Sequence, residues 1–112
     1  GCGGDRDRTK RPRMAKVAEQ YADRIIVTSD NPRSESPEII IGEIMTGFDD
    51  PVAESITHEV DRKKAIELAI KTAKKGDVIL IAGKGHEEYQ QIGDTVNHFS
   101  DIETAKEILN EL

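Results

Sequence analysis

Cysteine is nearly absent from the sequence, since Cys2 is the only one in 112 residues. A single cysteine excludes an internal disulfide and any metal site built from several cysteines. No apolar run approaches the roughly 20 residues that a membrane-spanning helix needs, and no signal-peptide pattern opens the chain. We therefore expect a protein of a reducing, cytoplasmic compartment that is not inserted into a membrane.

Positive charge is in deficit, with 16 lysines and arginines against 22 aspartates and glutamates, a formal net charge of -6. A nucleic-acid surface needs clustered lysine and arginine in excess, so this balance argues against a nucleic-acid partner. The basic cluster at residues 6–13 includes Asp7 and follows Asp5. Its residues alone leave open whether it is a solvated helix start or a ligand site.

The length suits one domain, and its apolar patterns alternate between two periods. Helical spacing predicts helices that begin near Pro12, Ser36, Asp61 and Ser100. Short β-branched or alternating runs predict strands at residues 24–28, 55–60 and 77–83. A hairpin is expected at residues 89–100. Strands that alternate with helices predict a Rossmann-like α/β fold, a mostly parallel sheet with helices on both faces.

Loops that leave the carboxyl ends of parallel strands gather at one edge of the sheet, where open α/β sheets bind ligands. Three loops are expected there: GCGGDRD at residues 1–7, SDNPRSE at residues 29–35 and GKGHEEYQ at residues 83–90. The first of them belongs to this edge if a first strand lies directly ahead of Gly1, as we expect.

The glycine-rich motifs do not match known nucleotide-binding patterns. GCGG lacks the GxGxxG pattern and GKGHEE lacks the GxxxxGK[ST] phosphate loop, which argues against a nucleotide site within the chain. Gly83 and Gly85 can relieve a tight turn or let the backbone touch a ligand. The histidines are scattered over different predicted elements, which argues against a zinc site, and only His86 lies in a candidate loop.

The DNPR motif, residues 30–33, has two interpretations. Asp and Asn favour turn geometry and Pro32 fixes φ, so the residues alone favour a simple turn. Arg33 gains a role if a carboxylate binds nearby, because a guanidinium fork matches a carboxylate with two hydrogen bonds. Glu87 and Glu88 can likewise be solvated charges, or one of them can hold a ligand ammonium.

Three motifs, in this order and spacing, closely resemble the C-terminal domain of the Mur ligases over essentially the whole chain. They are GCGGDRDRTKRPRM at residues 1–14, VTSDNPRSE at residues 27–35 and AGKGHEEYQ at residues 82–90. DNPR resembles the signature of the members that add meso-diaminopimelate, because lysine-adding members carry other residues there. The resemblance implies that residues 1–112 are the amino-acid-presenting domain of a three-domain, cytoplasmic enzyme of peptidoglycan-precursor synthesis. That enzyme uses ATP and Mg²⁺ to convert the glutamyl carboxylate of UDP-MurNAc-L-Ala-D-Glu into an acyl phosphate, which the incoming amine attacks.

The resemblance also implies where the ligands bind. ATP, Mg²⁺ and the UDP-linked substrate are expected on the other domains, so we expect no cofactor, no catalytic residue and no ligase activity in this chain alone. The positions that match the family's diaminopimelate-binding residues are Arg6, Asp30, Asn31, Pro32, Arg33, Gly83 and Glu87.

Each of these positions has an implied role, which most of them share with a second residue. Arg6 is expected to bind the carboxylate at the reacting end, whereas Asn31 and Arg33 bind the distal carboxylate. The Gly83 carbonyl and the Glu87 carboxylate hold the distal ammonium, and the other two residues shape the loop. A lysine-adding ligase domain and a non-catalytic α/β binding module are the alternative interpretations.

Overall fold

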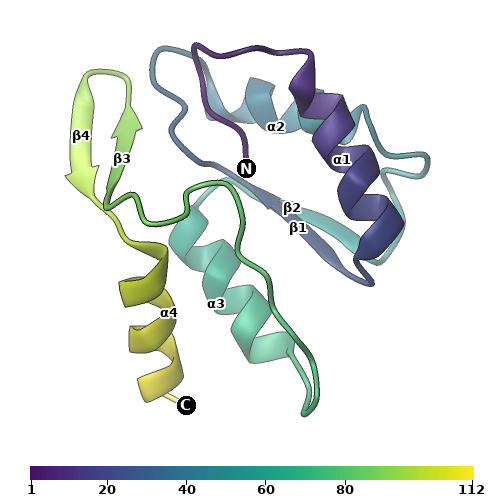
Figure 1. Cartoon of the computed structure of the whole chain (residues 1–112), viewed down its shortest axis with the longest axis vertical. Helices are drawn as coiled ribbons and strands as arrows, with labels where there is room; N and C mark the ends of the chain where they lie inside the picture. The colour runs from purple at the N-terminus through teal and green to yellow at the C-terminus, as the bar shows by residue number, and fades with distance from the viewer.

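Two short strands, β1 (Ile25–Thr28) and β2 (Ile56–Glu59), form a parallel sheet at the centre of the computed structural model, which describes residues 1–112. Ile25 lies opposite Ile56 and Thr28 opposite Glu59. Helices α1 (Lys10–Tyr21) and α2 (Pro37–Met45) lie on one side of this sheet, and α3 (Arg62–Thr72) and α4 (Asp101–Asn110) lie on the other (Figure 1). This arrangement confirms the expected α/β fold with helices on both faces of a parallel sheet.

The main apolar core lies between the sheet and the first two helices. Six residues form it: Ala15, Val27, Ile40, Ile41, Ile44 and Phe48. The three isoleucines recur at helical spacing on α2, so one face of that helix is buried against β1, as the sequence predicted. Gly47 allows α1 to approach, because a Cβ there would lie 2.1 Å from the carbonyl oxygen of Pro12.

Two of the predicted helix starts are capped by side chains. Asp61 Oδ1 accepts a hydrogen bond from Lys64 N at 3.1 Å, and Ser100 Oγ accepts one from Glu103 N at 3.2 Å. Ser36 occupies the corresponding position before α2, but its hydroxyl donates to the Glu38 carboxylate instead of capping a backbone amide. None of the helices combines the length and the apolar character required to cross a bilayer.

The predicted strand at residues 77–83 is wrong, because residues 77–82 have no regular structure. Val78 and Leu80 are 94% and 86% exposed, and no strand pairs with this segment. A β-branched run becomes a strand only where a neighbouring strand completes its hydrogen-bond ladder, and β1 pairs with β2 alone.

The predicted hairpin is present as β3 (Tyr89–Ile92) and β4 (Thr95–His98), which pair antiparallel.

The apolar faces of α1 and α4 are not buried as an amphipathic helix usually buries them. Several of their large apolar side chains face solvent: Met14, Val17, Tyr21, Ile102 and Leu109. α4 instead buries Asp101, Thr104 and Ile108.

The burial of Asp101 has a specific cause, the guanidinium of Arg62. Arg62 is 1% exposed on its side chain, and its Nε and Nη2 each donate to the Asp101 carboxylate at 2.8 Å. Its Nη1 also donates to the carbonyl of Ser29 at 2.8 Å, and Nη2 makes a longer contact of 3.4 Å with the carbonyl of Ala82. One side chain therefore joins α3 and α4 to Ser29, at the start of one candidate loop, and to Ala82, directly ahead of another.

We expect Arg62→Met to lower the free energy of unfolding by about 3–5 kcal/mol, because it leaves the buried Asp101 carboxylate without a counter-ion. Urea denaturation followed by circular dichroism measures this loss. Lys71→Met is the matched control, because Lys71 forms an exposed ion pair with Glu67 on the surface of α3. A loss no larger than that of the control would show that the Arg62 cluster does not stabilise the fold.

Candidate functional site

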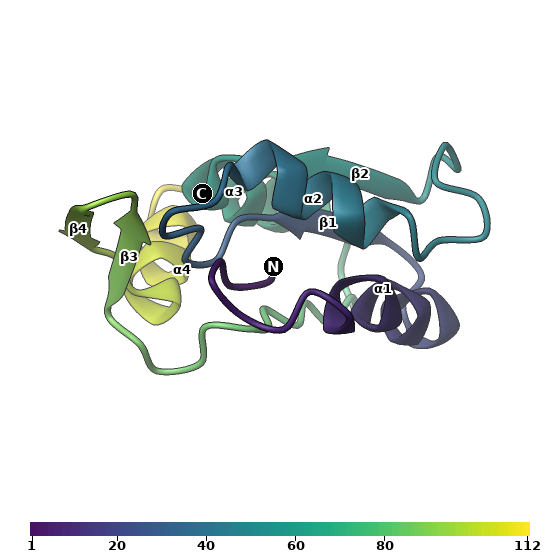
Figure 2. The same cartoon turned by 90° about the horizontal axis from the view of Figure 1, so that it is seen from above.

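The N-terminal loop (residues 1–9) lies directly against the loop that follows β1 (residues 29–35), here named the Asn31 loop. Gly4 N donates to the carbonyl of Asn31 at 2.7 Å, and the Arg33 guanidinium donates to the carbonyl of Gly4 at 3.0 Å. A Cβ on Gly4 would lie 1.7 Å from the carbonyl oxygen of Pro32, so only glycine permits this contact. Figure 2 shows the N-terminal segment passing alongside this loop.

The third loop, predicted at residues 83–90, is shorter in the structure, because Tyr89 and Gln90 belong to β3. Residues 82–88, here named the glycine loop, join the same cluster. Gly83 has φ +110, which favours glycine, and a Cβ there would lie 3.0 Å from the carbonyl oxygen of Gly1. The next residue, Lys84, donates from Nζ to Asn31 Oδ1 at 3.2 Å. The structure therefore brings together the three loops that the sequence predicted at one edge of the sheet.

The β3–β4 hairpin is a further part of this cluster. Arg33 N donates to the carbonyl of Gln91 at 3.0 Å, and Gly93 N donates to the carbonyl of Arg33 at 2.6 Å. Gln91 N also donates to Asn31 Oδ1 at 2.9 Å. Arg33 has φ 54, a left-handed conformation that costs a non-glycine residue about 1–3 kcal/mol and persists only where its surroundings fix it. The hairpin supplies these surroundings.

The predicted site residues differ in their burial. Asp30, Asn31 and Pro32 are buried, whereas Arg33 and Glu87 are half-buried and Arg6 is exposed. Arg6 and Arg33 both lie beside Gly3, because a Cβ on that glycine would be 3.5 Å from Arg6 Cγ and 2.9 Å from Arg33 Nη1.

Neither of these two arginines pairs with a carboxylate, and their guanidinium groups contact only backbone carbonyls. Glu87 accepts a hydrogen bond from the hydroxyl of Tyr89 at 3.2 Å and pairs with no cation. The cluster therefore offers two unpaired cations and one unpaired anion, which suits a ligand that carries both signs of charge. No group of three or more His, Cys, Asp or Glu side chains is arranged to hold a metal ion.

Comparison with known proteins identifies the family of the chain. The family model described as "Mur ligase, glutamate ligase domain" matches residues 1–85. The chain belongs to the Mur ligase family. Curated relatives from Gloeobacter violaceus and Haemophilus influenzae are 55% and 58% identical over 111 and 109 residues, which are 99% and 97% of this chain. Both relatives are named "UDP-N-acetylmuramoyl-L-alanyl-D-glutamate--2,6-diaminopimelate ligase".

A solved structure of a ligase with the same name superposes on this Mur ligase chain with a TM-score of 0.92 at 41% sequence identity. The match covers 99% of this chain and 23% of that structure. The chain likewise spans 22% of the length of the two curated relatives.

Two other arginines of the basic cluster in this Mur ligase domain, Arg8 and Arg11, have a structural role, whereas Lys10 and Arg13 are exposed and form no ion pair. Arg11 is 1% exposed on its side chain and donates two hydrogen bonds to the Glu35 carboxylate, at 2.7 and 3.0 Å. It also donates to the carbonyl of Gly3 at 3.0 Å, and both Arg11 and Arg8 pair with Glu43. These contacts attach the N-terminal loop to the Asn31 loop and to α2. The two interpretations of the basic cluster, a structural element or a ligand site, therefore apply to different residues. Arg8 and Arg11 are structural, whereas Arg6 forms no ion pair and can contact a ligand.

The Arg11 guanidinium, together with the N–H of Asp5, lowers the pKa of Glu35 from 4.5 to about 2. Because the folded pKa lies below the unfolded one, Glu35 stabilises the fold fully above about pH 4.5, and this contribution is lost as the pH falls toward 2. We expect the difference in unfolding free energy between the native chain and Glu35→Gln to be constant near neutral pH and to shrink below pH 4.5. Urea denaturation at a series of pH values measures it.

The control for this pH series is Glu54→Gln, because Glu54 is exposed and forms no ion pair. Its difference from the native chain should show no comparable decrease at low pH. A Glu35→Gln difference that stays constant down to pH 3 would show that Arg11 does not hold the Glu35 carboxylate in solution.

Sequence reasoning did not find two contributors to this cluster. Lys84 belongs to the GKGHEE motif but was given no role there. A lysine between two glycines, in a loop expected opposite Asp30, is the signal that could have indicated it. The docking of the hairpin on Arg33 had no signal in the sequence, because periodicity predicts a hairpin but not the surface against which it packs.

Proposed function

We propose that the chain is the amino-acid-presenting C-terminal domain of a cytoplasmic, ATP-dependent ligase of peptidoglycan-precursor synthesis. In this role residues 1–112 bind the incoming meso-diaminopimelate and close on the domain that holds ATP, so that the amine meets UDP-MurNAc-L-Ala-D-Glu. The names of the relatives that match nearly the whole chain support this role. The single observation that carries the proposal is the guanidinium of Arg33, which is held in place but pairs with no carboxylate.

Arg33 suits the distal carboxylate of diaminopimelate, the group that lysine lacks. Its backbone N–H and carbonyl both form hydrogen bonds with the hairpin. Of its guanidinium nitrogens only Nη1 forms hydrogen bonds, to the carbonyls of Gly4 and Asn31. The remaining guanidinium donors can bind a carboxylate in the planar fork geometry. Because the surrounding loops already order this side chain, little conformational entropy is lost when the ligand binds.

The other predicted site residues complement the rest of the zwitterion. Asn31 Oδ1 already accepts from Lys84 and Gln91, so the Nδ2 donor is the end of this amide that remains for a carboxylate. Glu87 and the Gly83 carbonyl supply acceptors for the distal ammonium. Arg6, on the opposite loop, supplies a cation for the carboxylate at the reacting end.

ATP and Mg²⁺ do not fit the residues of this chain. It contains no phosphate-binding loop pattern and no cluster of acidic side chains arranged for a metal ion. We therefore assign both to the other domains of the proposed ligase. The contribution of this domain is to bind the amino acid, to orient its reacting amine and to exclude amino acids that lack the second carboxylate.

Arg33→Ala tests the proposal through selectivity in a full-length ligase that contains this domain. Loss of a charge-assisted contact of about 1.5–3 kcal/mol should lower kcat/KM for diaminopimelate roughly 10- to 150-fold. The kcat/KM for lysine should change little, because lysine has no distal carboxylate to bind. Arg33→Lys should restore only part of the loss, since an ammonium cannot form the bidentate fork.

The matched control is Arg24→Ala, which removes an exposed arginine just ahead of β1, at the opposite end of that strand from the Asn31 loop. Both amino acids should be used as before in this variant. If Arg33→Ala lowers the two specificity constants by the same factor, Arg33 is a turn residue and the chain does not read the distal carboxylate. A native enzyme that prefers lysine would instead support a lysine-adding ligase.

Glu87→Ala tests the other end of the site. It should raise the KM for diaminopimelate, with a loss of about 1.5–3 kcal/mol in transition-state binding, and leave the KM values for ATP and the UDP-linked substrate unchanged. Initial rates at varied diaminopimelate measure the effect. Glu88→Ala is the neighbouring control, because Glu88 is exposed and its side chain makes no hydrogen bond. Equal kinetics in the two variants would mean that Glu87 is only a solvated charge.

A further inference from the structure

Lys84 is the most deeply buried charged group of the glycine loop, with 0% of its side chain exposed. Its Nζ donates to the carbonyl of Tyr89 at 2.8 Å and to Asn31 Oδ1 at 3.2 Å. The Asp30 carboxylate lies 3.1 Å away and forms an ion pair with it, without the alignment of a hydrogen bond. The ammonium also lies 5.8 Å from the centroid of the Tyr89 ring.

These contacts leave no room for Lys84 to bind a ligand. An ammonium has three donor hydrogens and no acceptor, and three oxygen atoms of the protein already surround this one. A buried charge is retained only where such partners compensate for its lost hydration. Any effect of Lys84 on ligand binding therefore passes through the groups that it holds.

The contacts of Lys84 connect the two halves of the proposed site, the Asn31 loop and the glycine loop. Asp30 and Asn31 lie in the loop that presents Arg33, whereas Lys84 itself lies between Gly83 and Glu87 in the other loop. Resting on the proposed function, we propose that Lys84 is a positioning residue. It fixes the spacing between the subsite for the distal carboxylate and the subsite for the distal ammonium.

Lys84 also determines which end of the Asn31 amide is presented. A donor-only ammonium and the N–H of Gln91 both point at Oδ1, so the amide oxygen is turned inward and Nδ2 is directed elsewhere. The role of Asp30 follows from the same contact. Its Oδ1 has no hydrogen-bond partner, and Lys84 is the one cation with which it forms an ion pair. The aspartate of the DNPR motif thus serves Lys84 and not the ligand.

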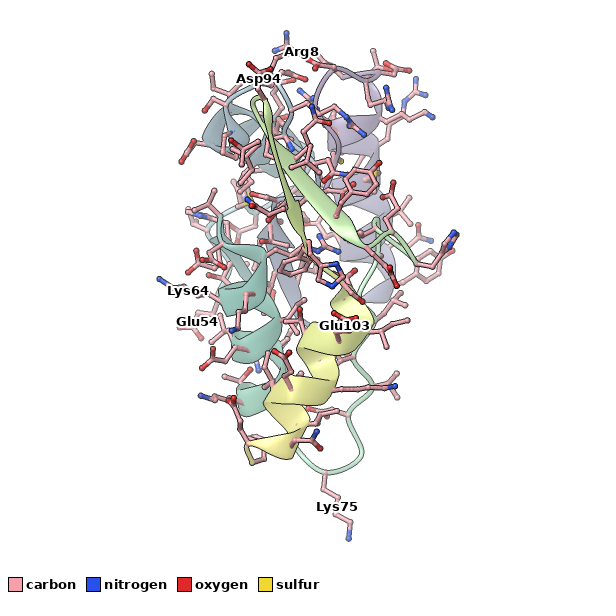
Figure 3. All side chains as sticks on the ribbon, turned by 90° about the vertical axis from the view of Figure 1, so that its left-hand side faces the viewer. Arg8, Glu54, Lys64, Lys75, Asp94 and Glu103 are labelled. Atoms are coloured by element: carbon pink, nitrogen blue, oxygen red, sulfur yellow. The ribbon has the colours of Figure 1, made fainter.

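The test is Lys84→Met in the full-length ligase, with Lys75→Met as the matched control. Figure 3 shows Lys75 projecting from the end of the molecule opposite Asp94, which marks the tip of the hairpin. Misplacing the two subsites by a fraction of their spacing should raise the KM for diaminopimelate about 10- to 100-fold. The KM for ATP should stay constant, and the diaminopimelate-to-lysine selectivity should fall. Lys75→Met should behave as the native enzyme.

A double-mutant cycle distinguishes positioning from a general loss of stability. In an Asn31→Ala background, Lys84→Met should raise the KM much less than it does in the native enzyme, because its effect passes through Asn31. Equal effects in both backgrounds would overturn the proposal. If Lys84→Met does not fold by circular dichroism, Asp30→Asn replaces it, and an unchanged KM for diaminopimelate in that variant would equally overturn the proposal.

Failure of this inference is distinguishable from failure of the proposed function. If Arg33→Ala impairs diaminopimelate use while folded Lys84→Met does not, Lys84 is a structural residue and the ligase assignment stands. If neither variant changes diaminopimelate use, both proposals are wrong.

Discussion

Asn31 accepts four hydrogen bonds, and through them every part of the candidate site is fixed to one residue. Its backbone carbonyl accepts from Gly4 N and from Arg33, and its side-chain oxygen accepts from Lys84 and from the N–H of Gln91. The two oxygen atoms of this one residue are thereby the junction of three loops and a hairpin. Because a buried donor or acceptor left unpaired costs about 1–3 kcal/mol, displacement of any one partner is opposed by all of the others.

The charged groups around this junction fall into two sets. Arg11, Arg62 and Lys84 are buried, and each is paired with a carboxylate of the protein. Arg6 and Arg33 are more exposed and have no such partner. The buried set fixes the loops, so that the second set is held at defined positions with unused hydrogen-bonding capacity. This division explains how an acidic chain can still leave two arginines without a carboxylate partner.

Much of the fold could be predicted from the sequence because its local signals are strong. The caps at Asp61 and Ser100 and the isoleucine face of α2 depend on neighbours within a few residues, and the structure has them. The segment at 77–83 has equally strong local signals but forms no strand. A strand depends on a partner elsewhere in the chain, which composition cannot supply.

The clustering of the loops was predictable to a similar extent. Topology placed the three loops together, but it could not show which charges the protein already uses. The sequence places Lys84 in a loop, where a lysine is usually exposed. Only the three-dimensional structure shows its buried ion pair with Asp30. Arg8 and Arg33 are both loop arginines in the sequence, yet Arg8 pairs with Glu43 and Arg33 pairs with no carboxylate.

The left-handed backbone of Arg33 has a consequence for how amino-acid preference can change in this family. The hairpin holds the main chain of this residue through its own N–H and carbonyl, so the loop does not depend on which side chain is attached. Asparagine or glycine tolerates φ 54 better than arginine does, and would relieve part of the strain. On the proposed role of Arg33, a lineage could therefore lose recognition of a second carboxylate by one substitution that also makes the loop more stable, whereas acquiring that recognition carries a cost in stability. A substitution of Arg33 that removes the preference for a second carboxylate should consequently be easier than a substitution that creates it.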